Sequence, residues 1–591
     1  MDVLNRSDSI WDLRRGDADD NRTSPAGRGW RNLALTTLLD FNYLSASIAF
    51  LLLIVVPALV VGLVPPIVVA YGKQKIESAT LIARYPIASI IWLAVLLVLA
   101  IWFARPVGSR AVDNFWHLHY TLVFPLFVGL RELISAGAER LPAKAMTADV
   151  LFRRRRIGTV LATLLLAGGA IAVAVSVKFS GSSVSTFIST RSMDVWALAL
   201  VGVRNALFIL AVSTVAASLF WFWHEITNDL PVRDWTPGPP PAGAEPTVRI
   251  AHLSDLHLVG EHYGYRMESG TGGPRGNGRI RRALRRLEAI HSATPLDRVV
   301  VTGDVTDAGT RAEWLEFFNL LRLSPELRGR VLFVPGNHDV NIVDRTNPGR
   351  FDTPWASGYA LRKLRVVLAL DAIQGRSVHV IDRGSGAVGP TLHDYLRQDD
   401  RPARLRALAG YGSFRGRHEV AVVWDEIFPL IAPPLDAGGY GVILLETNAR
   451  RYFSLTNAVG VVGRSQLAGL KQILQKSPPC RGWLILLHHH LVEYPIRSIG
   501  LRERIGVALV NAPDVLKVIA SSRSPVLVLH GHRHRDWIGA RGNVVICSAP
   551  SVAFGSKNAK DIRAGSFHIH ELAASADGGV QLVGSERVTV A

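Results

Sequence analysis

Thiols are scarce in this chain of 591 residues, which contains only two cysteines and four methionines. Cys480 and Cys547 cannot form the disulfide framework of a small secreted domain, and so low a count suits a reducing compartment. Oxygen and imidazole ligands without thiolate suit manganese, iron or zinc in a catalytic site rather than a structural thiolate knot.

Acidic residues are also few, 48 against 66 lysines and arginines, which gives a formal charge of +18. A basic balance of this kind indicates either nucleic-acid binding or the cytoplasmic side of a membrane protein. We find no internal repeat. At this length two or three domains are expected.

Four apolar stretches in the first 225 residues approach the roughly 20 residues that a spanning helix needs. They cover residues 44–70, 87–103 and 157–177 and a run that ends in the aromatic cluster 220–223. Arginines are concentrated in the N-terminal tail and between the second and third stretches. The positive-inside rule then predicts a multi-pass protein of the inner (cytoplasmic) membrane, in contact with membrane lipids. Its tail would cover residues 1–42 and its membrane region residues 43–225, with everything after Trp223 in the cytoplasm.

A proline-rich segment, residues 226–247, is predicted to be a semi-rigid linker. Beyond it, residues 248–591 contain short β-branched runs bounded by glycine and proline, which indicate buried strands. Five of these runs cover residues 248–253, 298–301, 331–334, 483–487 and 526–529. An amphipathic helix is predicted over residues 280–291. The alternation of strand and helix predicts an α/β domain in which polar residues at strand ends meet at one edge of a sheet.

A polar motif follows each of the five runs. The motifs are Asp255-Leu256-His257, Gly303-Asp304, Gly336-Asn337-His338-Asp339, His488-His489-His490 and Gly531-His532-Arg533-His534. Together they offer the carboxylate, imidazole and amide ligands that two divalent metals about 3.5–4 Å apart require. Histidines outside the motifs, such as His252 and His530, are expected to be ordinary core or surface residues.

These motifs resemble those of the calcineurin-like metallophosphoesterase superfamily, because all five are intact and stand in the family's order. The resemblance covers residues 248–552 at least. It implies a β-sandwich of two sheets flanked by helices, here preceded by an α-helical transmembrane bundle. It also implies two divalent metal ions, which would be manganese, iron or zinc.

The ligands that the resemblance implies divide between the two ions. The first ion takes Asp255, His257, His534 and the bridging Asp304. The second takes Asp304 again, with Asn337, His532 and one residue of the histidine run. Family members often have His-x-Pro at this run, and this chain lacks that proline. His488 is preferred as the first residue beyond the strand, and His489 stays open as the alternative.

The implied reaction is in-line attack of a metal-bridging hydroxide on a phosphate ester. His338 would protonate the leaving oxygen, and the carboxylate of Asp307 would orient this histidine. Protein Ser/Thr phosphatases of the superfamily carry arginine where this chain has Ala308 and Pro335, which disfavours that activity. The sequence Pro-Gly-Asn-His-Asp is instead similar to the branch that hydrolyses cyclic nucleotides and glycerophosphodiesters.

We therefore predict a membrane-anchored phosphodiesterase whose substrate is a cyclic nucleotide, a glycerophosphodiester or a lipid headgroup. The insert over residues 340–444 is expected to carry substrate choice, since loops over a scaffold usually do. One alternative is a metal-dependent nuclease, although membrane topology accounts for much of the basic charge and nucleic acid is not the expected partner. The other is a non-catalytic membrane sensor or scaffold that binds a nucleotide or a partner.

Overall fold

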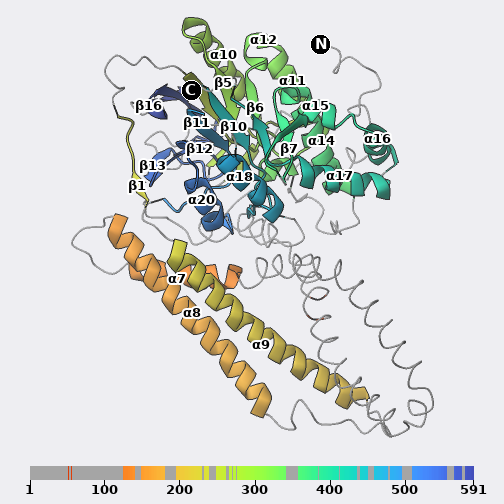
Figure 1. Cartoon of the computed structure of the whole chain (residues 1–591), viewed down its shortest axis with the longest axis vertical. Coiled ribbons are helices and arrows are strands. Elements are labelled where there is room, and N and C mark those ends of the chain that lie inside the picture. Colours follow the sequence, from red (N-terminus) through yellow and green to blue (C-terminus); the bar gives the residue numbers. More distant parts are fainter. Residues whose placement is uncertain are drawn as a thin grey trace. The chain divides into compact units, whose positions relative to one another are not determined.

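A computed structural model describes this chain as two compact units (Figure 1). One unit contains the helices up to Thr227, and the other contains the described residues from Asn228 onward. The described residues are 51, 55, 124–139, 148–179, 195–228, 232–238, 248–260, 265–268, 271–274, 276–340, 357–383, 385–411, 413–434, 439–449, 458–476, 480–494, 509–555, 565–574 and 579–590. The predicted tail lies outside them, as do the first two predicted membrane stretches apart from positions 51 and 55.

The described part of the first unit is helical. Its helices are α7 (Phe124–Glu139), α8 (Ala148–Phe179) and α9 (Val195–Asn228). Two segments of these helices are long and apolar enough to cross a bilayer, Phe152–Phe179 with 28 residues and Gly202–Thr227 with 26. They coincide with the third and fourth predicted membrane stretches. Leu164 and Leu165 of α8 are 64% and 59% exposed.

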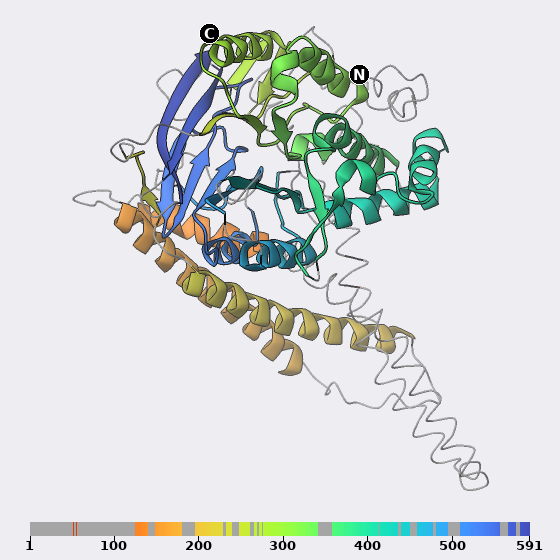
Figure 2. The same cartoon turned by 45° about the horizontal axis from the view of Figure 1, so that its top comes forward.

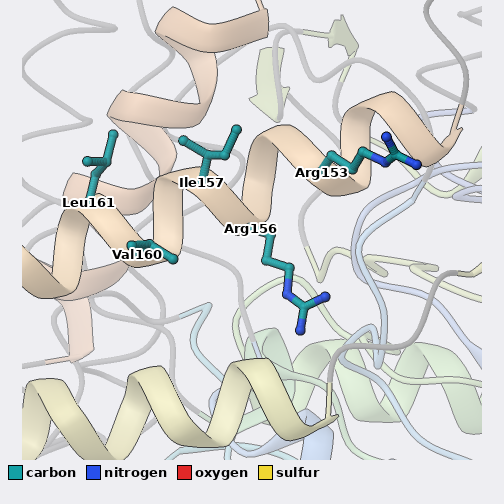
Figure 3. A pocket seen from close by; sticks show the side chains of 5 residues that line it. All are labelled: Arg153, Arg156, Ile157, Val160 and Leu161. Carbon is teal, nitrogen blue, oxygen red and sulfur yellow. The ribbon is translucent and has the colours of Figure 1, made fainter.

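Polar contacts join the three helices of this unit. Arg131 of α7 pairs with Glu225 of α9, and the hydroxyl of Thr159 on α8 donates to the same carboxylate at 2.7 Å. A hollow of about 470 Å³ lies on α8, lined by Arg153, Arg156 and the apolar side chains of the following turn (Figure 3). The apolar stretch of α8 therefore begins directly after a group of guanidinium side chains.

Two sheets form the body of the second unit (Figure 2). The smaller has the order β16 (Val580–Val590), β15 (Gly565–Ala574), β2 (Val248–Leu253), β5 (Arg298–Val301) and β6 (Val331–Phe333). The larger has the order β1 (Arg233–Asp234), β13 (Trp537–Arg541), β14 (Val544–Ser548), β12 (Val526–His530), β11 (Gly482–Leu486), β10 (Tyr440–Leu444), β9 (Leu430–Ala432), β7 (His379–Ile381) and β8 (Val388–Thr391). A separate hairpin joins β3 (Tyr265–Glu268) to β4 (Thr271–Pro274).

One hydrophobic core joins the two sheets, since Leu253 and Val300 of the smaller belong to the same buried cluster as Leu484 and Leu529 of the larger. The helices of this unit are α10 (Gly278–Ala293), α11 (Arg311–Arg322), α12 (Pro325–Arg328), α13 (Asn337–Val340), α14 (Ser357–Gln374), α15 (Leu392–Tyr395), α16 (Arg401–Tyr411), α17 (Phe414–Ile427), α18 (Arg464–Lys476) and α20 (Ala512–Ala520). Helices α18 and α20 cover the other face of the larger sheet through a second cluster. The predicted α/β fold of sheets and helices is confirmed.

The predicted strands are confirmed at all five motifs, and the first two have the predicted bounds. The prediction that the motifs meet at the edge of one sheet was wrong. The first three follow β2, β5 and β6 of the smaller sheet, and the last two follow β11 and β12 of the larger. Five neighbouring strands at about 4.8 Å spacing would spread their ends over about 19 Å. Two stacked sheets bring the same ends face to face.

Part of the predicted linker is an edge strand. Arg233 and Asp234 form β1 and pair antiparallel with Ala540 and Gly539 of β13. The indole nitrogen of Trp537 donates to the carboxylate of Asp234 at 2.8 Å. The segment 226–247 therefore begins with the last residues of α9 and supplies residues 233–234 to the larger sheet, while residues 239–247 lie outside the described part.

Much of the insert over residues 340–444 forms strands and helices of the second unit rather than loops. It supplies β7, β8, β9 and β10 to the larger sheet, and β10 pairs in parallel with β11. Leu364 and Val367 of α14 are buried in the core that the two sheets share. Deleting the insert would therefore remove part of the core, so a deletion cannot test its expected role in substrate choice.

A buried carboxyl group at the start of α11 makes the stability of this unit depend on pH. Thr310 and Glu313 form a capping box, and Glu313 also accepts from the backbone N–H of Ala308 at 3.0 Å. Burial, with a further contribution from nearby Asp307, raises the pKa of Glu313 from 4.5 to about 8. The folded protein therefore holds this proton more tightly than the unfolded chain does.

The stability that Glu313 contributes is fully present below pH 4.5 and is lost as the pH rises to about 8. The slope is at most about 1.4 kcal/mol per pH unit for one proton. Glu313→Gln keeps an acceptor oxygen but has no proton to lose. We expect its melting temperature to increase relative to that of the wild type as the pH rises from 5 to 8, because the wild type loses stability over this range. The exposed Glu326→Gln is the control and should follow the wild type. A difference between Glu313→Gln and the wild type that does not change with pH would contradict this.

Candidate metal centre

The predicted ligands form two groups where the strands of the two sheets end. One group is Asp255, His257 and His534, and the other is Asp304, His488 and His532. Within each group, one ligand atom from every residue lies within 4.8 Å of the others. All six side chains belong to residues that are buried or nearly so. The structure therefore brings together residues that are as much as 279 positions apart in the chain.

The first group surrounds the carboxylate of Asp255. Nε2 of His534 lies 3.2 Å from Oδ1 of Asp255, and Nε2 of His257 lies 3.9 Å from the same oxygen. Oδ2 of Asp255 accepts from the backbone N–H of His532 at 3.1 Å. Nε2 of His257 is also 3.7 Å from Oδ2 of Asp304, so this imidazole lies between the two carboxylates.

The second group converges on Nε2 of His488. This nitrogen lies 3.3 Å from Oδ2 of Asp304, 3.0 Å from Oδ1 of Asn337 and 3.1 Å from Nδ1 of His532. Oδ2 of Asp304 thus lies near His488 on one side and His257 on the other. A carboxylate in this position can reach a cation held by either group.

The two candidate residues of the histidine run differ in what their ring nitrogens contact. Nδ1 of His488 lies 2.8 Å from the carbonyl oxygen of Thr302, so it donates there and Nε2 is the nitrogen that faces the second group. Nδ1 of His489 pairs with the hydroxyl of Thr447 at 2.7 Å, and its ring centroid lies 4.4 Å from that of His532. The structure includes His488 in the second group and puts His489 beside it. Neither threonine belongs to a recognisable motif, so the sequence offered no signal for these contacts.

The donors of this site fit divalent metals. Nε2 of His532 is buried without a hydrogen-bond partner among the described residues. Leaving buried polar atoms unpaired costs free energy, and a bound cation would remove that cost for a nitrogen that reaches it. The set contains nitrogen and oxygen donors without thiolate, which suits manganese, iron or zinc.

Electrostatics keep both carboxylates of the site ionised. Burial acts to raise the pKa of Asp304, but His488 and His338 outweigh it and hold that pKa well below the ordinary range. Burial also acts to raise the pKa of Asp255, but the nearby His534 outweighs it, so this pKa is lowered as well. The reciprocal effect appears at His488, where burial lowers the pKa but Asp304 and Asp255 raise it to about 9. Ionised carboxylates are the form that binds a metal.

Most of the ligand residues share an unusual backbone conformation. Positive φ angles of 52°, 44°, 50°, 71° and 49° occur at Asp255, His257, Asp304, His532 and His534. Among the described non-glycine residues, Asp399 is the other example. This region of the backbone costs on the order of 1–3 kcal/mol per residue, and it is retained where the surrounding structure enforces it. Here it turns the chain sharply at the strand ends.

Two motif glycines permit the close approach of the ligands. Gly303 has φ of 93°, and a Cβ atom there would overlap the ring of His488. A Cβ atom at Gly336 would overlap the backbone N–H and the carboxylate of Asp304. Glycine is therefore required before Asp304 and before Asn337 for steric reasons.

His338 and Asp307 lie beside the two groups. The backbone N–H of His338 donates to Oδ1 of Asp304 at 2.8 Å, and its ring centroid lies 4.5 Å from that of His257. Nδ1 of His338 lies 2.8 Å from the main-chain carbonyl oxygen of Asp307, while the carboxylate of Asp307 lies 3.4 Å from Nδ1 of His257. A carbonyl oxygen only accepts, so Nδ1 carries a hydrogen and Nε2 of His338 is the nitrogen that can exchange a proton.

Asp339 braces the loops that carry the site. Its carboxylate accepts from the hydroxyl of Thr306 at 2.6 Å, from the backbone N–H of Thr306 at 2.8 Å and from that of Gly336 at 2.9 Å. Burial and the nearby charge of Asp304 raise its pKa to about 6. These bonds connect the second motif to the third.

Comparison with known proteins agrees with this geometry. Residues 248–536 match the model of the calcineurin-like phosphoesterase family. The matched segment contains all five motifs, from Asp255 to His534.

Two curated relatives resemble segments of this chain. A probable cyclic nucleotide phosphodiesterase of Coxiella burnetii is 30% identical over 105 residues, which cover 18% of this chain and 37% of the relative. A protein of the same description from Synechococcus sp. is 28% identical over 155 residues, which cover 26% of this chain and 50% of the relative. This chain therefore matches half the length of these relatives or less. Among solved structures, a dimetal phosphatase from Danio rerio is 12% identical with a TM-score of 0.33, over 59% of this chain and 100% of that one.

The steric requirement at Gly303 predicts a specific loss of metal. In Gly303→Ala the added Cβ displaces His488, so we expect this variant to bind at least one metal ion fewer per chain than the wild type. Gly329→Ala is the matched control, because nothing lies within 4 Å of a Cβ at that position. Elemental analysis of the purified full chain after dialysis measures the difference. Equal metal content in Gly303→Ala and the wild type would contradict the assignment of His488.

Proposed function

We propose that this protein is a membrane-anchored dinuclear-metal phosphodiesterase. Its substrate would be a cyclic nucleotide, a glycerophosphodiester or a lipid headgroup. The observation that supports this most is the position of Asp304, whose Oδ2 lies 3.3 Å from Nε2 of His488 and 3.7 Å from Nε2 of His257. A carboxylate between two groups of ligands is what a pair of neighbouring cations requires.

The proposed ligands fall into two sets that share Asp304. The first ion would be held by Asp255, His257, His534 and Asp304. The second would be held by Asn337, His488, His532 and Asp304. Two divalent ions bound there would supply a water activated at neutral pH and positive charge for the nonbridging phosphate oxygens.

His338 is the proposed general acid. Its Nδ1 hydrogen is held by the carbonyl oxygen of Asp307 at 2.8 Å, which fixes the ring and leaves Nε2 for a proton transfer. Its backbone N–H also contacts Asp304, so the ring is anchored next to the proposed reaction centre. Asp307 is a positioning residue, because it contacts His338 through its carbonyl oxygen and lies beside His257 through its carboxylate.

A phosphodiester is favoured over a monoester by the neutral loop positions. A phosphate monoester carries about −1.5 to −2 charge at pH 7 and needs more cationic contacts than a diester with its single charge. Ala308 and Pro335 occupy the positions where protein phosphatases of this superfamily have arginine. The two bacterial relatives named as probable cyclic nucleotide phosphodiesterases support the same choice over the part of the chain that they match.

Hydrolysis can be tested with the full chain purified in detergent and supplied with manganese. We expect turnover of bis(p-nitrophenyl) phosphate to exceed that of p-nitrophenyl phosphate. Asp304→Asn should lower diester turnover by about 10³-fold or more, because several kcal/mol of transition-state stabilisation would be lost. Asp394→Asn changes an exposed carboxylate of α15 and should behave as the wild type. No turnover by wild-type protein that binds two metals would contradict the proposal and favour the sensor or scaffold alternative.

The proposed role of His338 depends on the leaving group. We expect His338→Asn to lower kcat by about 10²–10⁴-fold for a dialkyl phosphodiester, whose alkoxide leaves only when protonated. The loss should be smaller for bis(p-nitrophenyl) phosphate, because p-nitrophenolate leaves readily without a proton. Metal content should match the wild type, which separates proton transfer from ligand loss. An equal loss with both substrates would argue against general-acid catalysis.

Membrane anchoring is proposed from the apolar segments Phe152–Phe179 and Gly202–Thr227. We expect the protein to stay with the membrane fraction in alkaline carbonate and in high salt, and to be released by detergent. Removing both segments should move it to the supernatant. Release of the full chain by salt alone would contradict anchoring, because salt removes only electrostatic attachment.

A further inference from the structure

Three buried histidines form a second cluster outside the candidate metal centre. His252 lies on β2, and His568 and His570 lie two positions apart on β15. The register puts His568 opposite His252 and His570 opposite Ile250, so all three are on the same face of the sheet. One ring nitrogen of each lies within 4.8 Å of the others, and the three residues are 0%, 2% and 0% exposed.

An oxygen atom holds each ring of this cluster. Nε2 of His252 lies 3.0 Å from the hydroxyl of Thr302, and Nδ1 of His570 lies 3.0 Å from the hydroxyl of Ser585. Nε2 of His568 lies 3.0 Å from the carboxylate of Asp536. Metal-binding histidines almost always have their second ring nitrogen held in this way, which fixes the ring and its tautomer.

The remaining nitrogen of each ring is left to the interior of the cluster. Nδ1 of His252 and Nε2 of His570 are 3.2 Å apart. Nδ1 of His568 is buried and has no hydrogen-bond partner among the described residues. Two neutral imidazoles can share one hydrogen, but that arrangement leaves the third nitrogen unsatisfied. A buried nitrogen of this kind has a free-energy cost that a cation would remove.

The charge state of the cluster suits a cation. Burial, followed by the neighbouring histidines, lowers the pKa of His252 well below its ordinary value. Burial and then His568 lower the pKa of His570 in the same way. Both rings are therefore neutral at physiological pH, which is the form that binds a metal.

We propose that His252, His568 and His570 bind a third divalent metal ion, additional to the two of the candidate centre. Three imidazole nitrogens select a borderline transition metal such as Zn²⁺. Because the cluster is buried, the role of this ion is structural. It joins β15 to β2, the strand that leads into Asp255. It therefore holds the hairpin of β15 and β16 to the rest of the smaller sheet.

Thr302 connects this cluster to the candidate centre. Its hydroxyl contacts Nε2 of His252 at 3.0 Å, and its carbonyl oxygen contacts Nδ1 of His488 at 2.8 Å. An ion on the far side of the His252 ring would therefore fix Thr302 and, through it, the orientation of His488. The third ion stabilises the ligand arrangement without touching a substrate.

Counting zinc in the full chain tests the third site. The protein is purified in detergent, loaded with Zn²⁺, dialysed and analysed for zinc per chain. The double variant His568→Gln, His570→Gln should bind one zinc ion fewer than the wild type. The control His393→Gln also removes an imidazole held by a carboxylate, that of Asp371 at 2.9 Å, and should match the wild type. Equal zinc content in the double variant and the wild type would overturn the proposal.

A second measurement covers the case in which the histidine variants do not fold. In Asp255→Asn, Asp304→Asn the carboxylates of the candidate centre are removed and the histidine cluster is unchanged. We expect this variant to retain about one zinc ion, whose X-ray absorption spectrum has imidazole scattering and no second metal nearby. A variant that folds but retains no zinc would overturn the third site. Neither readout depends on turnover, so the outcome is separate from that of the proposed phosphodiesterase activity.

Discussion

Two buried carboxylates, Asp255 and Asp304, impose the main constraint on the second unit. Both are almost completely excluded from solvent and remain ionised, which is costly unless cationic or hydrogen-bonding partners surround them. Their partners are imidazoles that come from the ends of strands in two different sheets. The two sheets must therefore be held at a fixed separation, and the hydrophobic core between them provides this.

The loops between the strands and the site are braced by groups that touch no substrate. Asp339 connects the second and third motifs through the N–H groups of Thr306 and Gly336. Glu313 accepts from the backbone at Ala308 and Thr310, and so holds the loop that contains Asp307. This bracing keeps the ligand residues in left-handed backbone conformations that an isolated loop would abandon.

Local sequence predicted the strands and the motifs because both depend on neighbouring residues. Short β-branched runs predict β2 and β5 without reference to the rest of the fold. Contacts between residues far apart in the chain could not be predicted from neighbouring residues in this way. The split of the motifs over two sheets depends on which strands pair, and the histidine cluster joins residues 318 positions apart. The choice between His488 and His489 depended on ring orientations, which follow from Thr302 and Thr447.

The order of the ligands along the chain has a consequence for how the protein is made. Asp255 and His534 contact one another across 279 residues. A nascent chain that has emerged only as far as β11 contains the carboxylates but not the last imidazoles, so it cannot form either group completely. A metal that needs either complete group could therefore bind only after translation of nearly the whole second unit. Residues 152–179 and 202–227 are synthesised well before that point, so any insertion of these helices into a bilayer can begin before the second unit has folded.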